Sequence, residues 1–588
     1  MKNLKLTAWP VLAALLMGPA GVALAPAATG ADASLIARAD IFGNPTRTGA
    51  KVSPDGKWIS FIAPRDGVLN VWVAPFGKLD EAKPITAATE RPIRQHYWSA
   101  DASRVIYLND KGGDENFLLY SVDPATGEEK ALTPFENTRA IPIGGSWSRP
   151  GEMLVGLNNR DPKWHDVYLL DIKTGELKLV LKNTEEYDSF TADDGLNLRF
   201  ASKVTADGGS DVYALGADGK AELFTNIPSD DALTTALAGI TTDGKTLYIA
   251  ESRGRGKSAI VAIDLETKAQ TVIAESDKAD VAESITDPLS GRVLAYAVDY
   301  IKSDWTAVDD SVKGDIEFLN TNLKGQWGVA SQSKDNNLWI IVNDATTEPV
   351  AFYVYDRAAK TVTKLFTTRP NLEGAPLSPM HGVEIKTRDG LTLVAYLTLP
   401  KGADADGDGK PEQALPMVLN VHGGPWARDT YGYDAEHQWL ANRGYAVLSV
   451  NYRGSTGFGK GFINAADREW GGKMHDDLID AVKWAVDSGV AREDKVAIYG
   501  GSYGGYATLV GLTMTPKTFA CGVDIVGPSN LETLIATIPP YWESFRQVFN
   551  RRVGDPSTPE GQSFLKSRSP LFLADKIERP LLVAQGAN

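Results

Sequence analysis

The chain has 588 residues, which is too long for a single hydrophobic core and predicts roughly two to four domains. Its hydrophobic fraction of 43% and charged fraction of 23% are ordinary for a water-soluble protein. A net charge of −15, without any block of lysine or arginine, argues against a nucleic-acid partner.

The first 27 residues have the pattern of a secretory signal peptide. Lys2 and Lys5 give a positive start, residues 11–17 are apolar, and small residues leading to Ala27 offer a cleavage site. The apolar segment is shorter than the ~20 residues of a membrane span, so an uncleaved anchor is the less favoured alternative. We therefore predict an exported protein, periplasmic or secreted, with no stable membrane insertion after signal cleavage.

Residues 35–375 contain a turn signal that recurs about every 45 residues, which is the period of a propeller blade. Nearly every turn precedes a run rich in β-forming residues, and a second hairpin follows in several units, for example at 167–171. Seven units predict a seven-bladed β-propeller, whereas a set of β-sandwich domains with similar turns is the alternative. The turns lie at 54–56, 101–102, 150–151, 194–195, 243–244, 290–291 and 335–336.

After residue 378, apolar runs of strand length predict the sheet of an α/β-hydrolase domain over 378–588. Residues 474–485 have helical spacing, with Asp476, Asp477 and Lys483 expected on the outer face and His475 as a capping or surface residue. The candidate strands are 382–387, 391–399, 416–421, 446–451, 495–499, 521–526 and 581–585.

An acidic loop lies between two of these strands. Asp404, Asp406 and Asp408 alternate, and Gly409 follows at the sixth position, as in the first half of an EF-hand loop. The twelfth position is Leu415, so the bidentate glutamate is missing. We favour a solvated acidic loop, with a calcium site as the alternative.

The strongest motif is the G-x-S-x-G pattern around Ser502. An apolar strand at 495–499 precedes it, and a helical pattern at 506–512 follows, which is the strand–turn–helix context that a serine nucleophile needs. At a helix N-terminus the hydroxyl lies where developing negative charge is favoured. A glycine-rich turn with an incidental serine is the alternative.

A second motif supplies an oxyanion hole. The strand at 416–421 ends in His422-Gly423-Gly424, which matches the loop that provides one backbone N–H in this fold. The other donor is the N–H of Tyr503, the residue after the nucleophile. His422 precedes Ser502, so we expect it to be structural and not the catalytic base.

Four motifs together resemble the prolyl oligopeptidase family of serine peptidases, in particular its bacterial acylaminoacyl-peptidase and dipeptidyl-peptidase-like branch. They are residues 422–425, 451–455 (Asn-Tyr-Arg-Gly-Ser), 470–472 (Trp-Gly-Gly) and 500–505. The resemblance covers nearly the whole chain after the leader. It implies a propeller that caps the hydrolase domain, peptides and small polypeptides as substrates, an acyl-enzyme on Ser502, and no metal or organic cofactor.

The resemblance also places the rest of the catalytic triad. In the family, the catalytic Asp directly follows the strand that residues 579–588 resemble, and the catalytic His comes after one more helix and strand. The last histidine of this sequence is His475, which precedes Ser502. We therefore expect both residues beyond Asn588, a hydrolase domain lacking its last strand and helices, and an inactive 588-residue chain. A natural pseudo-enzyme is the alternative, which the undamaged motifs disfavour.

Two other functions remain open on the sequence alone: an esterase on the same scaffold, and a non-catalytic binding protein that works through its propeller. The sequence also leaves open exopeptidase or endopeptidase action, the preferred residue before the cut bond, and the oligomeric state. Cys521 is the only cysteine, which excludes an internal disulfide.

Overall fold

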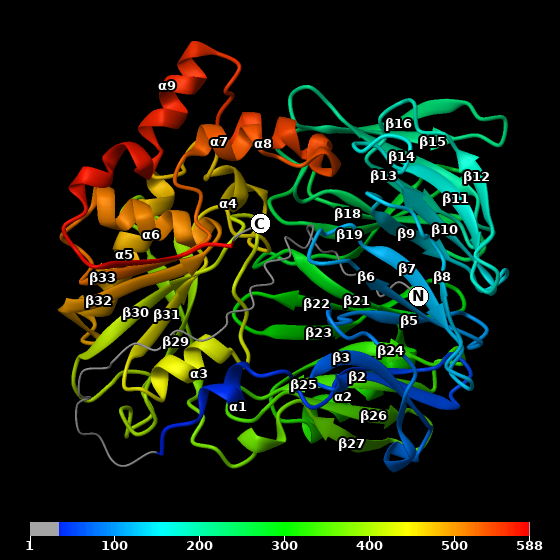
Figure 1. Cartoon of the computed structure of the whole chain (residues 1–588), viewed down its shortest axis with the longest axis horizontal. Coiled ribbons are helices and arrows are strands. Elements are labelled where there is room, and N and C mark those ends of the chain that lie inside the picture. The colour runs from blue at the N-terminus through cyan, green and yellow to red at the C-terminus, as the bar shows by residue number, and fades with distance from the viewer. Residues whose placement is uncertain (1–33, 587–588) are drawn as a thin grey trace.

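The computed structural model describes residues 34–586, which form a propeller and a hydrolase domain lying side by side (Figure 1). The predicted signal peptide lies outside these residues and stays a prediction. Within the described range, no helix is both long and apolar enough to cross a membrane.

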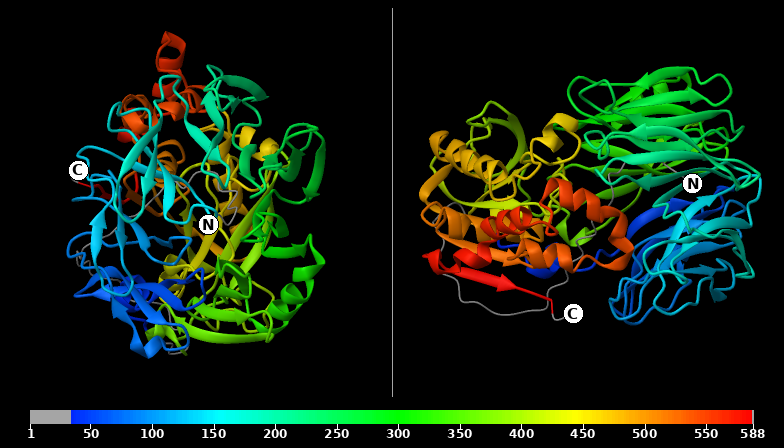
Figure 2. Two further views of the ribbon diagram at one scale, coloured as in Figure 1. Left: turned by 90° about the vertical axis from the view of Figure 1, so that its right-hand side faces the viewer. Right: turned by 90° about the horizontal axis from the view of Figure 1, so that it is seen from above.

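The propeller consists of seven small antiparallel sheets around a ring, which confirms the predicted architecture (Figures 1 and 2). Blade 1 contains β1 (Thr48–Val52), β2 (Trp58–Arg65), β3 (Val68–Pro75) and β4 (Lys83–Pro84), with a short helix η1 (Leu79–Glu81). Blade 2 contains β5 (His96–Trp98), β6 (Val105–Asn109), β7 (Leu118–Val122) and β8 (Glu129–Ala131). Blade 3 contains β9 (Ala140–Gly145), β10 (Glu152–Leu157), β11 (Asp166–Asp171) and β12 (Leu177–Leu181). Blade 4 contains β13 (Ser189–Ala192), β14 (Leu198–Val204), β15 (Ser210–Leu215) and β16 (Ala221–Ile227).

The last three blades include the one departure from four strands. Blade 5 contains β17 (Ala236–Ile240), β18 (Thr246–Glu251), β19 (Ala259–Asp264) and β20 (Gln270–Ala274). Blade 6 has only β21 (Val281–Thr286), β22 (Val293–Asp299) and β23 (Ser303–Ala307), followed by η2 (Asp310–Val312) and α2 (Lys313–Asn322). Blade 7 contains β24 (Gln326–Gln332), β25 (Leu338–Asp344), β26 (Ala351–Asp356) and β27 (Thr361–Thr367). In α2, Ile316 and Leu319 lie one turn apart and pack into the core of blades 6 and 7.

The repeated turn joins the first and second strands of a blade. In blade 1, Ser53 Oγ donates to Asp55 Oδ1 at 2.6 Å and accepts the N–H of Trp58 at 2.9 Å. Such contacts between a Ser or Thr hydroxyl and an Asp carboxylate satisfy the polar groups of the turn by hydrogen bonds within a few residues. Equivalent pairs occur at 99/101, 241/243 and 333/335. The sequence repeat thus has a direct structural cause.

Blades 1 and 7 meet to close the ring. Each blade is built from consecutive strands only, so no blade contains strands from both ends of the propeller. Phe61 of blade 1 packs on Phe366 of blade 7, with ring centroids 5.6 Å apart, in a shared hydrophobic cluster. The side-chain packing is supplemented by single hydrogen bonds, such as that from the Thr46 N–H to the Thr368 carbonyl at 2.9 Å.

The hydrolase domain is built on a seven-stranded sheet in the order β28-β29-β31-β30-β32-β33-β34. The first three strands in this order pair antiparallel and the remaining pairs are parallel. All seven predicted strands are present. They are β28 (Met380–Lys386), β29 (Thr392–Thr398), β30 (Leu415–Val421), β31 (Ala446–Val450), β32 (Ala491–Gly501), β33 (Cys521–Ile525) and β34 (Leu581–Ala584).

Helices flank this sheet, and two expectations for α5 were wrong. Asp477 is fully buried, because Arg453 reaches it from the loop after β31, and His475 is buried with Nε2 3.0 Å from the Thr515 hydroxyl. The helices are α3 (Ala435–Ala441), α4 (Lys460–Asn464), α5 (Lys473–Asp487), α6 (Tyr503–Met514), α7 (Leu531–Ala536), α8 (Arg546–Arg552) and α9 (Pro559–Ser567), with η3 (Pro370–Leu372), η4 (Pro540–Phe545) and η5 (Pro570–Lys576).

Helix α1 (Arg38–Phe42) lies against the hydrolase domain, although the predicted boundaries placed residues 35–375 with the propeller. Phe42 meets Trp439 of α3 edge-to-face at 5.7 Å, and Ile41 is fully buried in the same cluster (Figure 1). The first propeller strand begins only at Thr48.

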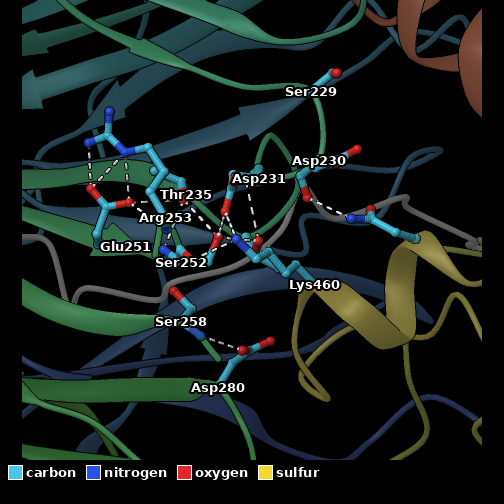
Figure 3. A network of polar contacts seen from close by, with 12 residues as sticks. Ser229, Asp230, Asp231, Thr235, Glu251, Ser252, Arg253, Ser258, Asp280 and Lys460 are labelled. Atoms are coloured by element: carbon cyan, nitrogen blue, oxygen red, sulfur yellow. Dashed lines mark hydrogen bonds and ion pairs between the residues drawn. The ribbon is translucent and has the colours of Figure 1, made fainter. Parts of the chain in front are cut away.

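Buried polar contacts join the two domains over blades 4 to 6 (Figure 3). Lys460 of α4 donates to Asp231 Oδ1 at 2.6 Å and to the Ser252 carbonyl at 3.0 Å. Asp280 accepts the N–H of Gly459 at 3.1 Å. Because these groups lie in loops of the propeller and in one segment of the hydrolase, they hold the domains in register.

We expect Lys460→Met to lower the free energy of unfolding by about 2 kcal/mol. Removing one partner of a buried ion pair typically costs about 3–5 kcal/mol, and the loss here is smaller because Lys460 keeps 24% exposure and Ser252 still donates to Asp231. Urea denaturation would measure it. The control is Lys483→Met, which breaks an exposed pair with Asp487 and should cost under about 0.5 kcal/mol. Equal losses in both variants would contradict the interface role of Lys460.

Candidate active site

Ser502 lies between β32 and α6 in a strained conformation, with φ 55° and ψ −117°. A non-glycine residue adopts such angles only where its surroundings impose them. Two backbone hydrogen bonds do so: the Ser502 N–H donates to Ile525 O at 2.8 Å, and the Tyr506 N–H donates to Ser502 O at 3.0 Å. The hydroxyl is thereby presented at the N-terminus of α6.

The glycines around Ser502 are required by close backbone approach. A Cβ on Gly504 would lie 2.0 Å from the Val421 carbonyl oxygen, and one on Gly500 would lie 2.6 Å from the same atom. Such distances are far below van der Waals contact, so only glycine fits. The end of β30 and the nucleophile turn are therefore packed backbone to backbone.

The loop after β30 lies directly against Ser502. A Cβ on Gly423 would be 3.4 Å from Ser502 Cβ, and Gly424 has φ 125°, which favours glycine. Tyr503 is the first residue of α6, where backbone N–H groups have no intrahelical acceptor. The structure thus brings together Ser502, Tyr503, Gly423 and Gly424, as the sequence predicts, and leaves N–H groups available for an oxyanion.

The hydrogen bonds of His422 argue against a role as the catalytic base. Its Nδ1 is 2.7 Å from the Gly423 carbonyl and its Nε2 is 2.9 Å from Ser455 Oγ. Its ring stacks on Tyr452 with centroids 4.5 Å apart. Burial lowers the pKa of His422 to about 4, so the imidazole is neutral near pH 7.

No histidine of the described chain, which holds all six, is hydrogen bonded to Ser502. His437 lies between the hydroxyls of Thr398 and Ser449, at 2.9 and 2.7 Å. His475 bonds Thr515, while the others lie in the propeller (96 and 165) or on β28 (381). Within residues 34–586, the predicted nucleophile and the predicted oxyanion donors therefore lie together, and no imidazole is hydrogen bonded to Ser502.

A layer of buried aromatic rings packs against the turn at Ser502. The sequence motifs alone do not predict this packing. The Tyr503 ring stacks on Tyr452 at 5.2 Å and meets Trp470 edge-to-face at 4.7 Å. Tyr506 also contacts Trp470, at 5.2 Å. Tyr452 and Trp470 belong to the motifs at 451–455 and 470–472, so these motifs are the sequence signal for the aromatic layer.

A cluster of ion pairs around the buried Arg453 anchors the loop that carries Tyr452 and Ser455. Arg453 donates to both carboxylate oxygens of Asp477, at 2.6 and 2.9 Å, and to those of Asp389, both at 2.9 Å. The hydrogen bonds from Arg453 lower the pKa of Asp389. Burial raises the pKa of Asp477, an effect that Arg453 opposes. The cluster therefore fixes the loop whose Tyr452 and Ser455 contact His422.

Aromatic residues of η4 and α8 lie beside the loop that follows β30, which we call the oxyanion loop (residues 422–426). Phe545 packs edge-to-face on Trp426 at 5.5 Å, so it belongs to the helical layer. Tyr541 instead reaches the propeller, where its hydroxyl donates to Glu115 at 2.8 Å, and Trp542 is 36% exposed. Phe545 therefore packs within the hydrolase domain, whereas Tyr541 contacts the propeller.

Asp404, Asp406 and Asp408 place one carboxylate oxygen each within 4.8 Å of one another. The N–H groups of Gly407 and Gly409 donate to Asp404 at 2.8 and 3.0 Å, so the loop is stabilised by its own backbone. Two of the three carboxylates are exposed. Calcium binding stays an untested alternative to the solvated loop.

Comparison with known proteins gives a consistent result. The prolyl oligopeptidase family matches residues 431–588. Dipeptidyl aminopeptidase BIII of Pseudoxanthomonas mexicana is 51% identical over 586 residues, which span 99% of this chain and 85% of that protein. Dipeptidyl peptidase family member 6 of Caenorhabditis elegans is 35% identical, over 94% of this chain and 79% of its own length.

Solved structures agree at the level of the fold. A puromycin-hydrolyzing peptidase of Mycobacterium tuberculosis superposes with a TM-score of 0.70 at 19% identity, covering 94% of this chain and 88% of its own. The identity to the P. mexicana enzyme, over nearly the whole sequence, is decisive. The chain belongs to the prolyl oligopeptidase family and is a serine peptidase.

Proposed function

We propose that Ser502 is the nucleophile and that the enzyme releases dipeptides from the free N-termini of peptides. The observation that carries the first part is the strained turn that presents Ser502 against Gly423. The second part is supported by the names of two relatives, a dipeptidyl aminopeptidase and a dipeptidyl peptidase family member.

The geometry supports a covalent route. Ser502 Oγ attacks the scissile carbonyl while a base takes the proton of its hydroxyl. The oxyanion that forms accepts hydrogen bonds from the backbone N–H groups of Tyr503 and of the Gly423–Gly424 loop. The intermediate collapses to an acyl-enzyme, the base returns the proton to the leaving amine, and water then releases the acyl group. Because none of the six histidines bonds Ser502, we propose that residues beyond the 588 supply this base and its aspartate.

Peptidase assays on two forms of the protein test this proposal. We expect a chain extended through the next in-frame stop to cleave dipeptidyl 4-nitroanilides, and the 588-residue chain to be inactive. Since a free amine is the expected recognition element, N-acetylation of the same substrate should slow cleavage by about 100-fold or more, as when a site's buried polar group is left unpaired.

Each other outcome has a definite meaning. Inactivity of both forms, with folded proteins, would favour a propeller binding protein. Hydrolysis of small esters alone would favour an esterase. Equal cleavage of free and N-acetylated substrates would contradict dipeptide release while leaving the role of Ser502 intact.

We also propose that the protein is exported through its N-terminal signal and acts in the periplasm or outside the cell. The charged start, short apolar segment and small residues up to Ala27 support this. N-terminal sequencing of the mature protein from a periplasmic fraction would test it, and an intact Met1 in the cytoplasm would contradict it.

A further inference from the structure

The imidazole of His422 bonds the backbone of the oxyanion loop itself. Nδ1 lies 2.7 Å from the carbonyl oxygen of Gly423, and a carbonyl can only accept a hydrogen bond. Nδ1 therefore carries a proton, while Nε2 lies 2.9 Å from Ser455 Oγ, a hydroxyl oxygen that also lies 2.7 Å from the Tyr452 carbonyl oxygen.

This contact fixes the direction of the next N–H. The Gly423–Gly424 peptide is trans, and in a planar trans peptide the C=O and N–H bonds point in opposite directions. With the Gly423 carbonyl held toward His422, the Gly424 N–H must point away from the imidazole. Within the described chain, the Gly424 N–H has no acceptor. It is a free donor next to Gly423, where an added Cβ would lie 3.4 Å from Ser502 Cβ.

The imidazole has little freedom to turn. Its ring stacks on Tyr452 with an interplanar angle of 16°, and Tyr452 is fully buried. The Tyr452 hydroxyl donates to the His422 carbonyl at 2.9 Å, so ring and backbone are held by the same partner. Ser455, also fully buried, is tied to Tyr452 through its own N–H at 3.0 Å.

We propose that His422 is a positioning residue that, through its Nδ1–H, orients the Gly423–Gly424 peptide so that the Gly424 N–H is the second oxyanion donor. The proposal rests on the proposed role of Ser502. It assigns the donor to Gly424 where the sequence left Gly423 and Gly424 open. The chain of contacts runs from the buried Arg453 cluster through Tyr452 and Ser455 to His422.

Two substitutions separate the hydrogen bond from the stacking. His422→Phe keeps a ring against Tyr452 but removes the donor, and in the extended, active protein kcat should fall about 100-fold with KM within about threefold. His422→Asn places an amide N–H near the position of Nδ1 and should recover at least about tenfold of that loss. Ser455→Ala leaves the Nδ1 donor in place and should cost less than about fivefold.

The outcomes distinguish this inference from the proposed function. If Ser502→Ala abolishes activity while His422→Phe keeps kcat within threefold, only the positioning role is wrong. A loss in His422→Phe that Asn does not rescue, or one that appears mainly in KM, would also overturn it. If Ser502→Ala stays active, the proposed function itself fails.

A spectroscopic test does not depend on turnover. In the 588-residue protein labelled with ¹⁵N-histidine, His422 should give the nitrogen shifts of a neutral Nδ1–H tautomer between pH 6 and 8, and His422→Phe should remove that signal. Signals of an Nε2–H tautomer would overturn the assignment.

Discussion

Ser502→Ala is expected to reduce peptidase activity of the extended enzyme by at least about 10⁴-fold. Loss of the nucleophile removes the covalent route, and comparable serine peptidases lose on the order of 10⁶-fold in kcat. The variant should fold normally, because the turn conformation is held by backbone hydrogen bonds at residue 502 and not by its side chain. Initial rates on a dipeptidyl 4-nitroanilide, with melting curves for both proteins, would measure this.

The control for Ser502→Ala is a hydroxyl removed elsewhere in the same domain. Ser488→Ala, at the end of α5, affects a hydroxyl that bonds only carbonyls of its own helix, so activity should stay within twofold of the parent. Retention of more than about a hundredth of the activity by Ser502→Ala would show that another group attacks the substrate.

Gly504→Ala is expected to lower the free energy of unfolding by about 3 kcal/mol and activity by at least about 100-fold. The added methyl would lie 2.0 Å from the Val421 carbonyl oxygen, and because that oxygen belongs to the backbone and cannot turn aside, β30 and α6 must separate. Because β30 leads into the oxyanion loop, that shift displaces the donors from Ser502, and displacements near 1 Å can cost about 100-fold in rate. Urea denaturation and kcat would measure the two effects.

A glycine in open surroundings provides the matched control. Gly461 lies in α4, is exposed, and an added Cβ would have no atom within 4 Å. Gly461→Ala should therefore leave activity unchanged and raise stability by up to about 1 kcal/mol. If Gly504→Ala behaved like Gly461→Ala, the close packing of β30 against the nucleophile turn would be refuted.

What could be predicted from the sequence was local. The propeller repeat depends on turns that close within a few residues, such as Ser53 to Asp55, and the nucleophile turn is encoded by adjacent glycines. What could not be predicted depends on distant partners. Helical spacing put Asp477 on the outer face because it carries no information about Arg453, 24 residues away, which makes its burial favourable. Helix α1 docks on α3 through residues about 400 positions away, for example Phe42 with Trp439.

The way the propeller ring closes bears on how this chain folds. Each blade contains only consecutive strands, so it can form soon after its own residues are available. The contact between Phe61 and Phe366 instead spans nearly the whole propeller and carries a large loop-closure entropy. During synthesis, the apolar face of blade 1 that packs on blade 7 therefore stays exposed to water until blade 7 has left the ribosome. We expect joining of this seam to be the slow, aggregation-sensitive step of folding, since it depends on side-chain packing between segments made far apart in time.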